Sequence, residues 1–206
     1  MYKNKDGIVE DSFQAFLVEG ADFTKEEEYP IQKEWMVPQN PPVKVMPFFK
    51  AITYQGDLSE YYIYFYSPDG TFERVRKNPK KYLHFFKRCK GIIGFDFSVH
   101  TDMPLIKQKA QLNDNLSLSF FYANNGVPLY PNCRGGSDNV NEEYLNAFPK
   151  HTYIALGVHG FVQLSRSLNL RVLLSLDISH MILLMIIKTW WSFISLIHLL
   201  MKEIRR

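Results

Sequence analysis

Cysteine is scarce in this chain of 206 residues, which contains only Cys89 and Cys133. Two cysteines are too few for a disulfide scaffold, and without a Cys-x-x-Cys pair there is no zinc knuckle. We interpret both as reduced thiols with structural rather than reactive roles. The N-terminal residues lack the apolar core of a secretory signal, so the sequence predicts a cytoplasmic protein.

The common catalytic and nucleotide-binding motifs are also missing. The chain contains no Walker loop and no G-x-G-x-x-G, H-E-x-x-H or G-x-S-x-G pattern, so the usual nucleotide, zinc-protease and hydrolase interpretations have no support. The net charge of +3 does not indicate nucleic acid by itself, because that indication needs a clustered basic face. A hydrophobic share of 46% and a charged share of 22% are typical of globular proteins.

What is present is an alternation of strands and helices. The expected strands are 43–49, 61–66, 92–97, 127–130 and 153–158, and the expected helices are 79–90, 104–123 and 141–147. The first of these helices has the clearest start, because Asn78 can cap it and Pro79 suits its first position. This order predicts an α/β fold with a mixed or mostly parallel sheet and covering helices.

The pattern divides the chain into three parts. Residues 1–42 are polar and proline-punctuated and are expected to form an N-terminal extension. Residues 43–160 form the α/β domain, and residues 161–206 form an atypical apolar tail that we expect to be helical.

Candidate catalytic residues follow the predicted strands, where ligands of α/β sheets bind. Asp96, Asp102 and His159 are candidate acid–base groups, and their oxygen and imidazole atoms also suit a divalent metal ion such as Mg²⁺, Mn²⁺ or Zn²⁺. The alternative is that Asp96 satisfies backbone groups at the strand end, Asp102 caps the next helix and His159 is a turn residue.

Candidate ligand-binding residues share the same loops. They are Ser98, Asn132, Arg134 and Asp138. Arg134 precedes two glycines, so its guanidinium and the nearby backbone N–H groups can hold a phosphate or carboxylate. The alternative is a loop with a surface arginine.

A basic segment between residues 74 and 90 interleaves cations with aromatic residues. Arg74, Arg76, Lys80 and Lys81 are candidate contacts to the phosphates of a nucleic acid. A solvated helix face, with cations placed at the helix C-terminus, is the alternative interpretation.

Five segments carry a family resemblance. They are Met-Pro-Phe at 46–48, Phe-Glu-Arg-Val-Arg-Lys-Asn-Pro-Lys-Lys-Tyr at 72–82, Gly-Phe-Asp-Phe-Ser at 94–98 with Asp-Met-Pro at 102–104, Gly126 with Pro-Asn-Cys-Arg-Gly-Gly at 131–136, and Ala-Leu-Gly-Val-His-Gly at 155–160. In this order the segments resemble a family of bacterial and phage proteins, domain of unknown function 4417, over about residues 45–160. The resemblance implies no mechanism, because the family has no agreed activity. Arg76 departs from it, since the family usually has Trp there.

The apolar tail does not match the polar, charged ending that the resemblance implies. Residues 181–201 are 21 residues with one Lys and one His, a length that suits a membrane helix. However, Lys188 and the Trp190-Trp191 pair fall inside this segment instead of at its ends. Three interpretations stay open: a membrane segment, a buried or partner-binding helix pair, and a reading-frame shift after about Gln163.

Three functional hypotheses follow from the sequence. The first is an enzyme that handles a phosphate-bearing or nucleotide-like ligand, with or without a divalent metal. The second is a non-catalytic accessory protein of a phage or mobile element that binds nucleic acid or a host protein. The third is membrane anchoring through 181–201.

Overall fold

The computed structural model describes residues 11, 13–137, 143–150, 152–157, 172–175 and 182–186. Its centre is a four-stranded sheet with the strand order β1-β2-β3-β4, and every neighbouring pair is parallel. The strands are β1 (Lys44–Pro47), β2 (Tyr61–Tyr64), β3 (Gly91–Ile93) and β4 (Leu129–Tyr130). The predicted α/β class with a parallel sheet is therefore confirmed.

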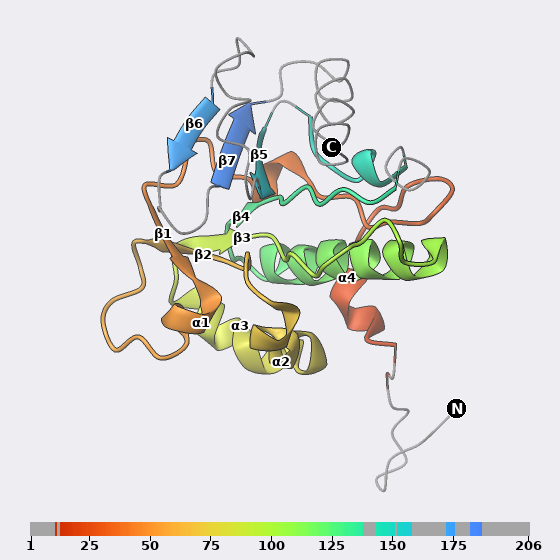
Figure 1. The fold of residues 1–206 in the computed structure, drawn as a ribbon. Coiled ribbons are helices and arrows are strands. Elements are labelled where there is room, and N and C mark those ends of the chain that lie inside the picture. The colour runs from red at the N-terminus through yellow and green to blue at the C-terminus, as the bar shows by residue number, and fades with distance from the viewer. Residues whose placement is uncertain are drawn as a thin grey trace, which may run out of the picture.

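Helices connect each strand to the next, and in Figure 1 the shorter ones lie beneath the sheet while the longest extends to its right. They are α1 (Phe48–Ala51), α2 (Glu73–Lys77), α3 (Pro79–Lys87) and α4 (Leu105–Asn124), with a 3-10 turn η3 (Asp69–Thr71) before α2. Helix α3 begins with Pro79 at its first position, as predicted, although Asn78 makes no side-chain capping bond. Parallel strands need such crossovers, because a tight turn can only reverse the chain.

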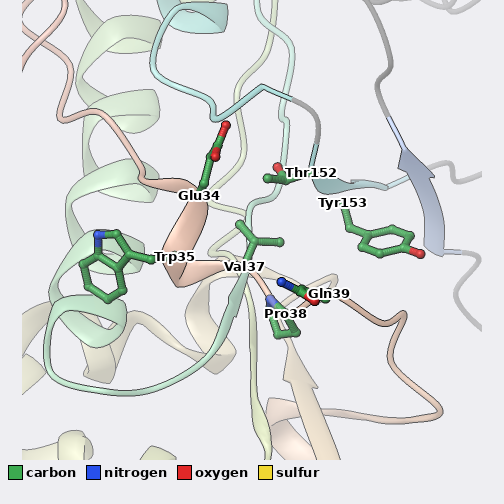
Figure 2. Close-up of a pocket in the computed structure, with 7 residues that line it drawn as sticks. All are labelled: Glu34, Trp35, Val37, Pro38, Gln39, Thr152 and Tyr153. Carbon is green, nitrogen blue, oxygen red and sulfur yellow. The ribbon is translucent and has the colours of Figure 1, made fainter.

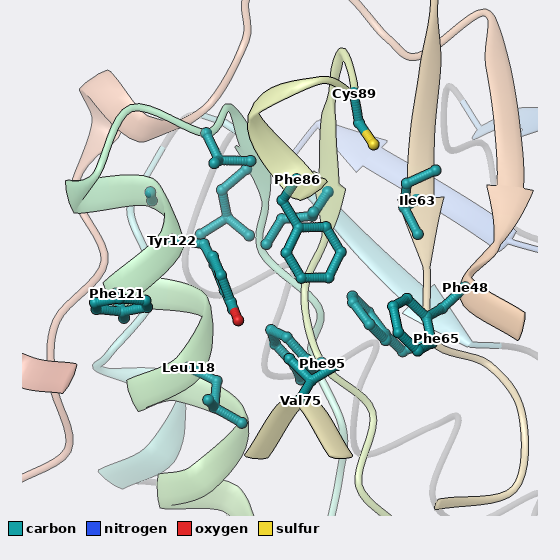
Figure 3. Close-up of a cluster of buried hydrophobic side chains, with 14 of the residues drawn as sticks. Phe48, Ile63, Phe65, Val75, Phe86, Cys89, Phe95, Leu118, Phe121 and Tyr122 are labelled. Carbon is teal, nitrogen blue, oxygen red and sulfur yellow. The ribbon is translucent and has the colours of Figure 1, made fainter. Parts of the chain in front are cut away.

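The helix-covered face of the sheet is an aromatic core (Figure 3). Phe65 stacks on Phe95 with ring centroids 4.1 Å apart, and Phe86 of α3 meets Tyr122 of α4 edge-on at 4.7 Å. The Tyr122 hydroxyl donates a hydrogen bond of 2.8 Å to the Pro79 carbonyl. This bond satisfies the one polar atom of a buried ring and ties α4 to the start of α3.

The opposite face of the sheet is rich in tyrosine. Strand residues alternate between faces, so Ile63 points to the helices while Tyr62 and Tyr64 lie in a second cluster. Val37 covers that second cluster, next to the short 3-10 turn η2 (Glu34–Met36), and Ala155 covers it from the other end of the chain. The predicted N-terminal extension therefore supplies part of the core.

A second sheet continues from the end of β4. Its order is β5-β7-β6, with β5 (Tyr153–Gly157), β6 (Val172–Ser175) and β7 (Ile182–Ile186) in antiparallel pairs. Asn132 forms an isolated parallel bridge with Ala155, so β5 runs alongside the chain that leaves β4. This pairing brings the residues that follow β4 next to β5.

The prediction of a helical tail is wrong for the part of the tail that the structure describes, because β6 and β7 are strands. Short apolar runs do not distinguish a buried strand from a buried helix by periodicity, and here antiparallel partners are available on both sides of β7. Within the described ranges, no helix is both long and apolar enough to cross a membrane. The remaining residues of the 181–201 segment lie outside the described residues.

Close packing at the start of β3 depends on glycine. A Cβ added to Gly91 would lie 2.4 Å from the Pro128 carbonyl oxygen and 2.5 Å from the Tyr62 ring. We predict that Gly91→Ala lowers the free energy of unfolding by about 1–3 kcal/mol, since backbone and ring must both move. Urea denaturation measures this loss.

Gly70→Ala is the matched control, because a Cβ at Gly70 meets nothing within 4 Å. It should change the free energy of unfolding by less than about 0.5 kcal/mol. Equal stability of the two variants would contradict the packing described for β3.

Candidate functional site

Polar side chains converge where β2, β3 and β4 end. Asp96 follows β3 by three residues, while Asn132 and Arg134 follow β4. Tyr66 comes from the end of β2. Because the strands are parallel, all of these residues leave the sheet at its carboxyl edge. The sequence predicted this position for Asp96, Asn132 and Arg134 but not for Tyr66.

An ion pair between Asp96 and Arg134 is the centre of this group. Arg134 Nη1 lies 2.8 Å from Asp96 Oδ2. The Asp96 side chain is 7% exposed and that of Arg134 is 32% exposed. The carboxylate is thus a buried anchor, and the arginine reaches from it towards solvent.

Asn132 holds the second oxygen of Asp96. Its Nδ2 donates to Asp96 Oδ1 at 2.9 Å and to the Phe95 carbonyl at 3.1 Å, and its Oδ1 accepts from the Tyr66 hydroxyl at 2.8 Å. Burial raises the pKa of Tyr66, so the phenol stays protonated and donates. The Asn132 side chain therefore has a fixed orientation, because both of its ends have partners.

Tyr144 fixes the backbone on either side of Cys133. Its hydroxyl donates to the Asn132 carbonyl at 3.3 Å and accepts from the Arg134 backbone N–H at 3.3 Å. Cys133 itself is buried, and burial raises its thiol pKa. A raised pKa disfavours the thiolate, in agreement with the structural role predicted for this cysteine.

Burial raises the pKa of Asp96 from 3.8 to about 6. The charge of Arg134 and the hydrogen bond from Asn132 act in the opposite direction, and the negative charge of Asp69 adds to the increase. The cost of desolvating the carboxylate thus exceeds the stabilisation that its two partners give to the charged form.

Asp69 and Ser98 form a second polar pair at the same edge. The Ser98 backbone N–H lies 3.1 and 3.2 Å from the two Asp69 carboxylate oxygens, and the Ser98 hydroxyl donates to Oδ1 at 3.0 Å. The sequence indicated Ser98 but not Asp69. The available signal was the Ser-Pro-Asp-Gly sequence at 67–70, directly after β2, which by itself is typical only of a turn.

The structure brings together four of the predicted site residues. Asp96, Asn132 and Arg134 form one network, and Ser98 contacts Asp69 beside it. Asp102 is exposed in the turn before α4, and no hydrogen bond or ion pair found in the described part of the chain involves it. Asp138 and His159 lie outside the described residues.

Metal binding has no support from the described side chains. Among the residues that the structure describes, no three His, Cys, Asp or Glu side chains gather closely enough to hold an ion. Asp96 instead directs one oxygen to an amide and the other to a guanidinium.

A pocket of about 610 Å³ lies elsewhere, between η2 and β5 (Figure 2). Its lining residues are Glu34, Trp35, Val37, Pro38, Gln39, Thr152 and Tyr153. None of them belongs to the Asp96 network. We place the candidate site at the carboxyl edge because the buried charges and the shifted pKa are there.

The fold and this site define an α/β protein with a buried carboxylate and an arginine at the carboxyl edge of a parallel sheet. The chain belongs to the family DUF4417, a domain of unknown function, whose model matches residues 25–198. The match extends beyond the segments at 45–160 that carried the resemblance. No curated protein and no solved structure matches the chain.

The raised pKa of Asp96 makes stability depend on pH. From about pH 4 to 6 the folded protein holds the Asp96 proton more tightly than the unfolded chain, so this group's contribution to the free energy of unfolding falls as pH rises. The total change is about 3 kcal/mol at most. Asp96→Asn lacks this contribution. The free energy of unfolding of wild type minus that of the variant should therefore fall from pH 4 to 6 and then become constant.

Urea denaturation of both proteins between about pH 4 and 7.5 checks this prediction. Asp102→Asn, which removes an exposed carboxylate, is the control and should keep the loss of stability that Asp96 causes between pH 4 and 6. A wild-type advantage over Asp96→Asn that grows from pH 4 to 6 would contradict the raised pKa.

Proposed function

We propose that this chain is an enzyme that binds a phosphate-bearing, nucleotide-like ligand at the carboxyl edge of its parallel sheet. The observation that carries the proposal is the buried Asp96 carboxylate paired with the partly exposed Arg134 guanidinium. Parallel α/β sheets bind their ligands at this edge, because the loops that follow neighbouring strands converge there.

Arg134 is the anion-binding group in this proposal. Asp96 holds it through one terminal nitrogen, at 2.8 Å, and Tyr144 fixes its backbone N–H. A guanidinium group has five N–H donors in a planar arrangement that matches the oxygens of a phosphate. Holding the arginine in place before the ligand arrives reduces the entropy that binding must otherwise remove.

Asp96 is the proposed acid–base group. A pKa of about 6 lies close to the working range in which a carboxyl group exchanges protons efficiently near neutral pH. A phosphate bound to Arg134 would offset the positive charge that lowers the pKa of Asp96, and so favour the protonated acid. Asp102, His159 and Asp138 stay candidates for further roles on their positions in the sequence.

The cellular setting belongs to the same proposal. Cys89 and Cys133 are both free and buried, as expected for a protein of a reducing compartment, which supports a cytoplasmic location. The family resemblance supports a bacterial or phage origin. The reading-frame shift after about Gln163 stays a prediction that sequencing of the coding DNA would test.

Calorimetric titration with inorganic phosphate and with AMP tests the anion site. Arg134→Gln should weaken binding by about 10- to 100-fold, as expected for the loss of a charged hydrogen-bond donor. The double variant Asp96→Asn/Arg134→Gln removes both charges, so it tests binding without leaving an unpaired buried carboxylate. Lys107→Gln, an exposed position on α4, is the charge-matched control and should bind normally.

Turnover separates the role of Asp96 from that of Arg134. With nucleoside phosphates and sugar phosphates as substrates, Asp96→Asn should lower kcat by about 10²- to 10⁴-fold, the usual contribution of a general acid or base, while phosphate still binds. If wild-type protein binds neither phosphate nor AMP, or if Asp96→Asn retains full turnover, the proposal is wrong.

A further inference from the structure

One stretch of the chain carries a large share of its positive charge. Residues 74–90 contain eight of the 24 Lys and Arg residues and none of the 21 Asp and Glu residues. The whole chain has a net charge of +3, so the rest of it is net negative. This asymmetry places a local positive field over α2 and α3, which lie side by side at the bottom of Figure 1.

The polar residues of α3 lie on one face of the helix. At about 100° per residue, these residues and Arg88, which follows the last residue of α3, fall within an arc of roughly 120° around the helix axis. These residues are Lys80, Lys81, His84, Lys87 and Arg88, and all are exposed. We call this surface the basic face of α3.

The opposite arc of α3 is apolar and is used in the core. Phe86 is fully buried, while Tyr82, Leu83 and Phe85 pack against the main cluster. An amphipathic helix that binds a membrane inserts its apolar side into the lipid. Because that side of α3 packs against the protein core, the fully exposed residues of the helix are the polar ones on the basic face.

Among the residues that the structure describes, most cations of this stretch have no acidic partner. Arg76 is the main exception, because its guanidinium pairs with Glu73 and Asp114 at 2.8 and 2.9 Å and lies over the Phe97 ring. Lys90 lies 3.7 Å from Glu60. In the part of the chain that the structure describes, no ion pair involves any residue of the basic face.

We propose that the basic face of α3 binds the phosphate backbone of a nucleic acid. Nine helical residues rise about 13 Å, which corresponds to about four phosphates along one strand at 3.4 Å of axis each. Protein interfaces usually contain buried aromatic or aliphatic anchors. No exposed large hydrophobic residue of the described chain lies between 72 and 90, so the face fits a hydrophilic polyanion rather than a folded protein.

The sequence suggested Arg76 as a phosphate contact, but its guanidinium is already paired with Glu73 and Asp114, so we do not include it in the proposed nucleic-acid surface. It is a structural residue that joins α2 to α4 through Asp114. Lys80 has a mixed role, because its ammonium lies 4.0 Å from the centre of the Phe16 ring. Lys81 and Lys87 are the cleanest probes, since they are exposed and have no such contact among the described residues.

The test compares two double variants of the full-length protein. Lys81→Gln/Lys87→Gln removes two charges from the basic face, and Lys25→Gln/Lys107→Gln removes two exposed charges elsewhere. Fluorescence anisotropy with duplex DNA, single-stranded DNA and single-stranded RNA of equal length, over a series of salt concentrations, gives affinity and salt dependence. Anionic phospholipid vesicles serve as a non-nucleic polyanionic surface.

We expect wild type to bind at least one of the three nucleic acids with strong salt dependence. Lys81→Gln/Lys87→Gln should weaken binding about tenfold at low salt and reduce the slope of log K against log salt by about two for duplex DNA. The control pair should bind as wild type does, and the strongest of the three nucleic-acid ligands identifies the preferred form.

Three outcomes would overturn the proposal. They are no binding of any nucleic acid at low salt, equal weakening in both double variants, and binding to anionic vesicles in preference to nucleic acid. Equal weakening would mean that only the overall charge matters. Failure of the phosphate site at Arg134 would leave the proposal intact, because none of these variants touches that residue.

Discussion

Asn132 connects the ends of four strands, and the carboxyl edge depends on it. Its side chain reaches Tyr66 beyond β2 and both Phe95 and Asp96 beyond β3, while its backbone bridges to Ala155 of β5. A buried amide with partners at both ends has only one orientation that satisfies it. The position of the Asp96 carboxylate, and through it that of Arg134, follows from this one side chain.

The buried ion pair is a poor source of stability and a good source of order. Desolvation offsets much of the attraction between a buried carboxylate and its partner, and the raised pKa of Asp96 reflects that cost. What the protein gains is a guanidinium whose place is set by the sheet, although Arg134 lies on a loop. Loops carry functional groups best when a rigid scaffold positions them.

The sequence predicted the alternation of strands and helices well because local signals specify it. Pro79 marked the start of α3, and the polar residues after β3 and β4 marked the site. Asp69 was missed because its partner, Ser98, lies 29 residues away, and Tyr66 and Tyr144 were missed because a tyrosine in a pattern is first of all apolar. The tail at 182–186 was mistaken for helix because its strand pairing with β5 is a long-range contact, which no window of neighbouring residues contains.

The tyrosine face of the sheet, which carries Tyr62, Tyr64, Tyr66 and Tyr130, is completed by residues from both ends of the described chain, and this affects the order of folding during synthesis. The helices that cover the other face lie between the strands they connect, so that half of the core can assemble as the chain emerges. The tyrosine face instead waits for Ala155 to meet Val37, two residues that are more than a hundred positions apart. Contacts of such separation form late because closing the loop costs entropy first. A ribosome that pauses before β5 would therefore hold a half-covered sheet with its tyrosines open to water and to other chains.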